Sequence, residues 1–475
     1  MATGETENEE TIDWRKALFT REAWWGYLVV ALGGLAAGLG AMYFCGVELF
    51  VGGYVRDWNN EQPWLAFLVM PAFLILIIYL RDNFFCGTDG TGIPQTIAAL
   101  KLRDGVARDA VLSMRIAVGK LILTTLGLLA YLSIGREGPS VQLGACFMRC
   151  CNRFAHFPAH LVQRGLILAG GAAGIAAAFN APIAGVVFAM EEIGRRFDKN
   201  NMGTLVRTVI LACVVCTIFM GNYYFYGDLD HDRDPLMFDS IGQWLIVPVI
   251  AIVGGLLGGL FSRTLLICMP HVGRAMKKNF VITAGLIGLS CACLAWFTEG
   301  GTLGSGYAQA QALLLQGSPE YLETLTPHHQ DILAEAKDHV TPFYFLWRAL
   351  ATFLVLLTAI PGGLFDPSFS VGAGMGHTLF PMFAWSGATE QSVILLFIVA
   401  YFSGVVQSPM TSFIILLEMT GVTMFALPLA MTAMLAYEVS RLVCRTALYE
   451  ALAFNFLKNA TCAPEEPKTS EKPAL

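Results

Sequence analysis

The stretch that decides the fold is Gly135-Arg136-Glu137-Gly138-Pro139, which interrupts an otherwise apolar part of the sequence. Glycine lets the chain turn and exposes backbone N–H groups, and proline is favoured at the first position of a helix. We therefore expect a helix to begin here, with its free N–H groups pointing at something negative. The carboxylate of Glu137 stands where an anion would bind, which is the arrangement expected of a gate.

The composition around this stretch is that of a membrane protein. Of 475 residues, 55% are hydrophobic and 14% are charged, against about 25% charged in soluble domains. Several apolar runs fall short of the roughly 20 residues that a perpendicular span needs, and Gly or Pro interrupts many of them. Broken helices are typical of transporters and channels, because unwound backbone is tolerated in a membrane only where it is buried or lines a watery path. We expect an all-α polytopic membrane protein.

Several function classes are disfavoured. A net charge of −6 gives no basis for nucleic-acid binding. Cys213 and Cys216 lie in an apolar run without a second ligand pair, so packing is favoured over a metal or redox site. His328 and His329 are expected in a solvated loop. Fewer than twenty residues follow Leu457, so we expect no soluble regulatory domain there.

The deciding stretch has a copy, Gly363-Leu364-Phe365-Asp366-Pro367, which follows it by 228 residues. Ala176–Glu192 and Val405–Met419 each place Pro and Glu nine residues apart, at an offset of 227. A third pair is Gly90–Ile93 and Gly304–Tyr307, at 214. We therefore predict a duplicated membrane domain. Its repeats are 21–225 and 226–460, between a cytoplasmic tail at 1–20 and a tail at 461–475.

The orientation of the two repeats is open from the sequence, since transporter repeats can be parallel or inverted. Inverted repeats would bring helix N-termini from opposite faces together near the midplane, where their positive ends can stabilise a dehydrated anion. We favour inversion on that ground.

Three signatures and a terminal tyrosine resemble the CLC family of chloride channels and chloride/proton antiporters. The family signatures GSGIP, GREGP and GxFxP are matched in order by Gly90–Pro94 (with Thr91 for Ser), Gly135–Pro139 and Gly363–Pro367, followed by Tyr449. The resemblance runs from about residue 25 to 460. It implies a CLC-like fold of two inverted repeats, bacterial-type and without C-terminal CBS domains, in homodimers within the bacterial inner membrane. It also implies chloride and protons as substrates, with no cofactor, no metal and no enzymatic activity.

The resemblance also implies roles for individual residues. Hydroxyl groups of Thr91 and Tyr449 would donate to the anion. The full anion site would comprise Thr91, Gly92, Ile93, Gly138, Leu364, Phe365 and Tyr449. Glu137 matches the gating glutamate, and Glu192 matches the inner proton-transfer glutamate that marks antiporters.

The repeat separates Glu192 from its neighbour. Glu191 has a repeat partner, Glu418, and is expected to be structural, whereas Glu192 stands opposite Met419. Adjacent helical residues diverge by about 100°, so one of the two is expected to face a given path. The alternative is that Glu192 is a charge at the helix end, near Arg195 and Arg196.

Two residues depart from the family pattern or lack an evident partner. Lys120 lies in an apolar stretch, and the acidic partner that some members have is replaced by Ile97, so Lys120 needs another partner. Asp366 stands where the family usually has an apolar residue and should repel chloride if it faces the pore. We expect it to cap its helix and point away; the alternative is a second titratable group.

The expected function is exchange of chloride for protons, in which ionised Glu137 competes with the anion and Glu192 relays protons inside. The first alternative is a CLC-type chloride channel without proton coupling. A cation-coupled amino acid transporter would need a cluster of carbonyls and carboxylates that the sequence does not show. A phosphate-binding enzyme is disfavoured because GxxxxGK[ST] is absent.

Overall fold

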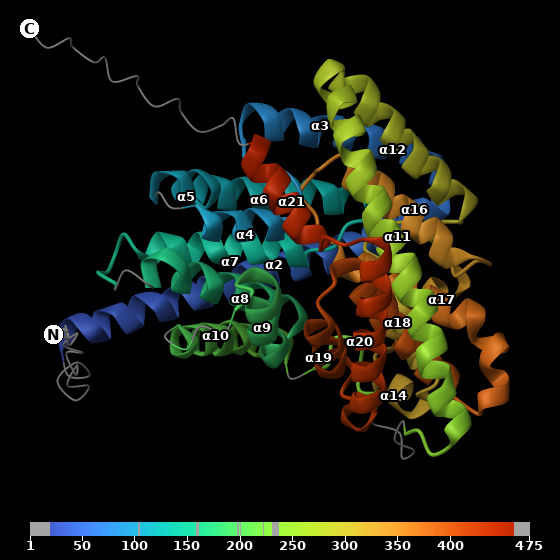
Figure 1. Ribbon diagram of the computed structural model, residues 1–475. Coiled ribbons are helices and arrows are strands. Elements are labelled where there is room, and N and C mark those ends of the chain that lie inside the picture. Colours follow the sequence, from blue (N-terminus) through green and yellow to red (C-terminus); the bar gives the residue numbers. More distant parts are fainter. Residues whose placement is uncertain are drawn as a thin grey trace, which may run out of the picture.

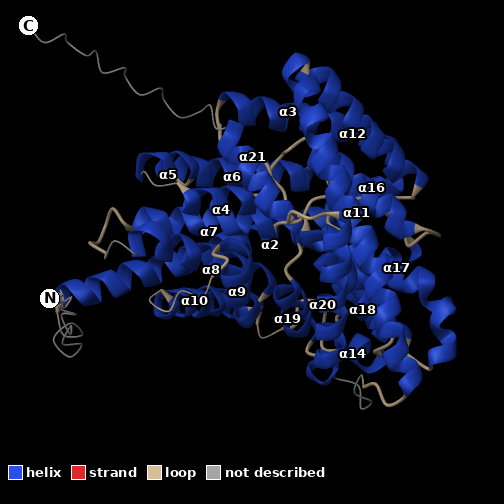
Figure 2. Cartoon of the chain, in the orientation of Figure 1, coloured by secondary structure: helices blue, strands red, loops and turns tan. Residues whose placement is uncertain are grey.

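The computed structural model describes residues 20–102, 105–157, 161–196, 199, 201–221, 223–229 and 237–459 as helices joined by loops (Figures 1 and 2). Seven helices in this part of the chain are long and apolar enough to cross a membrane. They confirm the prediction of an all-α multi-pass membrane protein. The two predicted tails lie outside the described residues, apart from Thr20.

Three-residue turns aside, the described residues of the first half form the helices α2 (Arg21–Glu61), α3 (Ala66–Asn83), α4 (Ile93–Lys101), α5 (Gly105–Val111), α6 (Met114–Leu129), α7 (Glu137–Cys151), α8 (Leu166–Phe179), α9 (Pro182–Phe188) and α10 (Met202–Met220), with the π-helical segments η2 (Leu161–Gly165) and η3 (Ala189–Ile193). Three-residue turns aside, the second half contains α11 (Ile241–Lys278), α12 (Phe280–Phe297), α13 (Tyr307–Leu315), α14 (Pro319–Thr324), α15 (Pro327–Asp338), α16 (Tyr344–Leu357), α17 (Phe365–Leu379), η4 (Phe380–Ser386), α18 (Glu390–Val406), α19 (Pro409–Thr420), α20 (Ala426–Val443) and α21 (Leu448–Asn459).

Most helices of each half pack together, as the colours in Figure 1 show, but α3 of the first half packs on α12 of the second half. Within the bundles, α7 packs on α8 and α17 packs on α18, and the last helix, α21, returns to lie against α4 of the first half. Close packing depends on glycine: a Cβ on Gly144 or Gly170 would collide with the backbone of the facing helix, and one on Gly372 would collide with Ile398. Such small residues let membrane helices approach closely.

The two halves meet through a pair of glycines. The N–H of Gly135 donates to the carbonyl of Gly363 at 2.9 Å, and the N–H of Gly363 donates back to Gly135 at 2.5 Å, in an antiparallel bridge. Both glycines precede the first helical residue by two positions, so the bridge joins the loops that lead into α7 and α17. The stretch singled out in the sequence is therefore bonded directly to its own copy.

A second exchange of hydrogen bonds surrounds this bridge. The N–H of Gly90 donates to Ala359 at 2.7 Å, and the N–H of Gly304 donates to Tyr131 at 2.8 Å. Tyr131 and Ala359 are 228 residues apart, and both adopt a φ of 52°, which is uncommon for residues other than glycine. Each half therefore donates one hydrogen bond to the other half and accepts the equivalent bond from it. A two-fold axis produces this relation, which agrees with inverted repeats.

Glu191 and Glu418 complete the exchange. The Glu191 carboxylate accepts the first N–H groups of α19 at 3.0 and 2.7 Å, and the Glu418 carboxylate accepts those of α9 at 3.0 and 2.6 Å. A carboxylate at a helix N-terminus is favoured by the helix dipole and by the unpaired N–H groups. The predicted structural role of Glu191 is confirmed.

Two buried cations hold the glycine loops. The ammonium of Lys120 donates to the carbonyl of Gly90 at 2.6 Å, which supplies the partner that the sequence left open. Arg348, 228 residues later, donates to the carbonyls of Gly301 and Gly304 at 2.6 and 2.7 Å. Both side chains are fully buried. Lys120 and Arg348 are thus equivalent supports for the loops that precede α4 and α13.

The polar stretch at 318–339 is not the solvated loop that we expected. It forms α14 and α15, and α15 begins with Pro327 after Thr326, whose hydroxyl accepts the N–H of His329 at 3.4 Å. Proline at the first helical position after a threonine cap is a recognisable start signal. His329 is half-buried, with its Nε2 3.4 Å from Gln311 Oε1. The prediction of a solvated loop was wrong, because Pro327 after Thr326 starts a helix here.

Replacing Arg348 with methionine keeps a long unbranched side chain but removes the guanidinium N–H groups that donate to the loop before α13. Buried carbonyls would lose a charged partner, so we expect a loss of about 3 kcal/mol in stability. Thermal unfolding in detergent micelles would measure it. Arg441→Met is the matched control, since Arg441 is half-exposed and pairs with Glu438 at 3.9 Å. Equal melting temperatures for the two variants would contradict the assigned role.

Candidate anion and proton site

Glu137 is the first residue of α7 and is fully buried. Its Oε1 accepts the N–H of Arg136 at 3.1 Å, and its Oε2 has no hydrogen-bond partner in the described part of the chain. A Cβ on either Gly135 or Gly363 would collide with this carboxylate. The carboxylate therefore lies against the glycine bridge, between the helix N-termini of the two repeats.

The first signature meets the second at the start of α4. A Cβ on Gly138 would collide with the carbonyl of Thr91, and a Cβ on Gly92 would collide with the carbonyl of Gly138. Gly92 also has a φ of 107°, which favours glycine. Its N–H is bonded to Gln95 Oε1 at 3.0 Å. Gly92 therefore serves close packing, and the prediction that its backbone binds the anion is not supported by this geometry.

The hydroxyl groups of Thr91 and Tyr449 are buried without a hydrogen-bond partner among the described residues. Leaving such a group unpaired costs about 1–3 kcal/mol. Tyr449 stands at the start of α21, which packs on α4, so the two hydroxyls come from neighbouring helices. Two hydroxyl donors that are left unpaired at this cost are suited to bind an anion and to release it again.

The third signature supplies the start of α17. Leu364 precedes the helix, Phe365 begins it, and the first N–H groups of a helix have no partner within it. The ring of Phe365 lies 6.4 Å from that of Tyr449. The structure thus brings Thr91, Ile93, Gly138, Leu364, Phe365 and Tyr449 onto three neighbouring helix starts and α21. Binding of an anion by these residues stays a prediction.

Tyr449 is within electrostatic reach of both Glu137 and Glu192. Glu192 belongs to the π-helical η3 and is 1% exposed. Ser408 donates to its Oε2 at 2.5 Å, and Arg195 lies 3.6 Å from its Oε1. Glu192 is thus a buried carboxylate, and its neighbour Arg195 is a partly exposed charge at the end of the helix. It sits where the protein interior meets the surface.

Asp366 does not cap its helix. It is the second residue of α17, inside the first turn, whereas a cap precedes the helix. Asp366 is fully buried, and no donor in the described part of the chain reaches either of its oxygens. Its carboxyl is close enough to the Glu137 carboxyl for the two to interact electrostatically. The expectation that Asp366 points away from the site was wrong.

The sequence analysis did not predict the ion pair next to Glu137. The guanidinium of Arg136 is buried 3.4 Å from the carboxylate of Glu48, and Ser305 donates to Glu48 at 2.5 Å. Glu48 is an acidic residue within an apolar membrane helix, α2, and such a residue is a functional hypothesis by default. This acidic residue in an apolar run could have been singled out from the sequence.

Cys213 and Cys216 are buried free thiols on α10, and the thiol of Cys216 donates to the carbonyl of Ala177 at 3.2 Å. This contact is the packing role that the sequence favoured. In the ranges that the structure describes, no cluster of three or more His, Cys, Asp or Glu side chains has a geometry that would hold a metal ion.

Comparison with known proteins gives the same picture. The sequence profile described as "Voltage gated chloride channel", Voltage_CLC, matches residues 73–441. The H(+)/Cl(-) exchange transporter ClcA of Cronobacter sakazakii is 27% identical over 90% of this chain and 88% of its own length. ClcA of Vibrio cholerae is 26% identical over 90% of this chain and 88% of that protein.

Solved structures share the fold. A slow cyanobacterial Cl−/H+ antiporter superposes with a TM-score of 0.73 at 21% identity, over 92% of this chain and 98% of that one. A CLC-type fluoride/proton antiporter gives a TM-score of 0.69 at 21% identity, over 90% and 96%. This chain belongs to the CLC family of voltage-gated chloride channels and related transporters.

A methyl group at residue 363 would test the glycine bridge. Gly363→Ala places a Cβ against the Glu137 carboxylate and the Gly135 backbone, so we expect a loss of about 2 kcal/mol in stability. Gly273→Ala is the control, because a Cβ on Gly273 meets no atom within 4 Å. Thermal unfolding of both variants in micelles would show the difference. A Gly363→Ala protein as stable as the control would contradict the packing described.

Proposed function

We propose that this protein is a secondary active transporter that exchanges chloride, or a similar anion, for protons across a bacterial plasma membrane. One observation carries the proposal: Glu137 holds an unpaired carboxylate oxygen at the convergence of helix N-termini from two repeats. The names of the ClcA relatives, which match most of this chain, support the same reading.

Competition for one site would couple the two substrates. Ionised Glu137 occupies the positive ends of α7 and α17 as an anion would. A proton neutralises this carboxylate, and the helix ends then favour a free anion over the side chain. Hydroxyl groups of Thr91 and Tyr449 would replace part of the hydration shell of that anion. Because proton and anion displace each other, they move in opposite directions.

The proton would leave by a path of its own. Glu192 is buried and contacts Arg195, which also pairs with Glu450. A carboxyl at this boundary can receive a proton from the gate region and release it to the cytoplasm. The anion path instead passes between Thr91 and Tyr449, so the two routes diverge below Glu137.

The remaining assignments follow from family membership. We infer a homodimer in a lipid bilayer with one pore per subunit, and no cofactor beyond the transported chloride and protons. Thr91 keeps the hydroxyl of the usual serine, so chloride is favoured. A chloride channel without proton coupling is the alternative; buried Glu192 favours the exchanger.

Proteoliposomes with an outward chloride gradient would test the proposal. We expect the wild-type protein to drive protons uphill. Glu137→Gln cannot be ionised, so anion flux should continue while proton transport falls to the level of empty liposomes. Glu192→Gln should lose proton transport and keep anion flux, because it removes the inner proton carrier alone. Chloride and pH electrodes would record both fluxes.

Glu438→Gln is the control, because Glu438 is exposed on α20 and contacts Arg441 at 3.9 Å. It should behave as the wild type does. Proton transport that survived in Glu137→Gln would contradict the exchange scheme. Chloride flux in the wild type that moved no protons would identify a channel instead.

A further inference from the structure

Asp366 and Glu137 form a pair of buried carboxyl groups across the glycine bridge. Glu137 begins α7, Asp366 is the second residue of α17, and the Gly135–Gly363 bridge holds the two helix starts together. Both side chains have 0% exposure, Glu137 Oε2 and both Asp366 oxygens lack a donor in the described part of the chain, and the two carboxyl groups are close enough to interact electrostatically. Two ionised carboxylates have no hydrogen to donate, so this contact is favourable only when one of them carries a proton.

The charges around the pair also require a proton. Arg136 is the cation beside the pair, and Glu48 lies 3.4 Å from its guanidinium. Full ionisation would therefore place three carboxylates around one guanidinium in a buried site. Neighbouring buried carboxyl groups do not both ionise readily, as pairs of catalytic carboxyl groups illustrate.

Other groups that face the pair are phenols. Tyr226 is fully buried, its hydroxyl has no partner among the described residues, and it is within electrostatic reach of both Asp366 and Glu137. Tyr307 of α13 donates its hydroxyl to the carbonyl of Phe225 at 2.7 Å and is occupied. Neither phenol brings a positive charge, so neither relieves the repulsion between the carboxylates.

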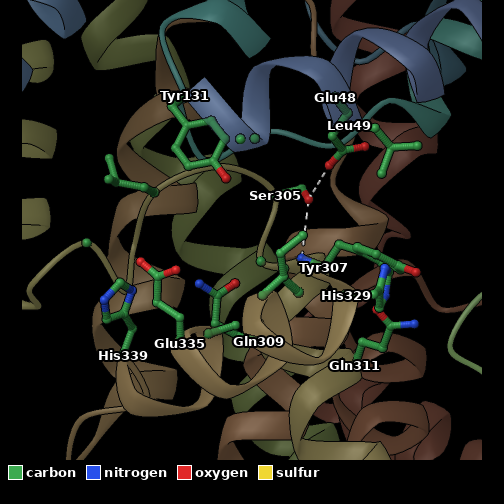
Figure 3. A pocket seen from close by; sticks show the side chains of 18 residues that line it. Glu48, Leu49, Tyr131, Ser305, Tyr307, Gln309, Gln311, His329, Glu335 and His339 are labelled. Carbon is green, nitrogen blue, oxygen red and sulfur yellow. Dashed lines mark hydrogen bonds between the residues drawn. The ribbon is translucent and has the colours of Figure 1, made fainter. Parts of the chain in front are cut away.

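A cavity of about 150 Å³ adjoins the pair through Glu48. Figure 3 shows Glu48 of α2 bonded to Ser305 on one side, with His329, Glu335 and His339 across the cavity. The Glu48 side chain is 17% exposed, while its other neighbour is buried Arg136. Glu48 thus links a cavity lined by titratable groups to the charges around Asp366.

We propose that Asp366 is a second proton-carrying residue of the gate, forming with Glu137 a carboxyl pair that shares one proton. This inference rests on the proposed function and deepens it. In the step that opens the gate, the O–H bond on Asp366 breaks and one forms on Glu137, and the negative charge passes to Asp366. No oxidant or reductant is involved. Arg136 stabilises the charge that Asp366 acquires.

A shared proton changes the pH at which the gate works. The pair keeps one proton at a pH where a single carboxyl would have lost it, because two adjacent ionised carboxylates repel each other. Asp366→Asn has nearly the same shape and no charge, and it leaves Glu137 as a lone carboxyl. Its anion flux should therefore fall at neutral pH and recover only in more acidic solution.

The test is chloride flux from proteoliposomes as a function of pH, for the wild type, Asp366→Asn and Asp366→Ala. For both variants we expect the midpoint of the flux profile to move to lower pH by about one unit or more. Glu438→Gln should keep the wild-type midpoint. A midpoint that stays at the wild-type value in both Asp366 variants would overturn the proposal.

A double variant separates this role from a purely structural one. In Glu137→Gln the gate cannot ionise, so adding Asp366→Asn should leave the flux profile unchanged. A shift that persists in that background would mean that Asp366 acts independently of Glu137 and would also overturn the proposal. Because this readout uses anion flux alone, it stays informative if the wild type moves no protons.

Discussion

The pairing of Gly135 with Gly363 is the contact on which the rest of the site depends. Two backbone hydrogen bonds fix the loops before α7 and α17 against each other, and only glycine leaves room there for a carboxylate. That geometry aims two helix N-termini at one point and places Glu137 on it. Lys120 and Arg348 hold the flanking loops by their carbonyls, so the polar backbone that interrupts these membrane helices is satisfied inside the protein.

Symmetry separates support from function in this fold. Elements that occur twice, such as the caps made by Glu191 and Glu418, hold the two halves together in the same way. The groups proposed to carry protons break the symmetry. Glu137 corresponds to Phe365, and Glu192 corresponds to Met419, so the duplicated scaffold carries each of these two carboxyl groups once.

Much of this was predictable, because duplication and glycine-rich helix starts are written in the order and spacing of residues. The membrane class follows from composition, whereas the repeat, the position of Glu137 at a helix start and the structural role of Glu191 follow from spacing. The surroundings of a side chain do not: Asp366 was expected to point away, yet it lies buried in the first turn, close enough to Glu137 to interact electrostatically. Gly92 was likewise expected at the anion site, but its N–H donates to Gln95, a pairing that only three-dimensional contact reveals.

The central claim is that one anion binds where the helix starts of both repeats meet α21. Crystals of the protein grown with bromide in place of chloride test it directly, because bromide scatters anomalously. We predict an anomalous peak within hydrogen-bonding distance of the Thr91 and Tyr449 hydroxyls and of the first N–H groups of α17. A structure with ordered bromide elsewhere and none in contact with either hydroxyl would contradict the account.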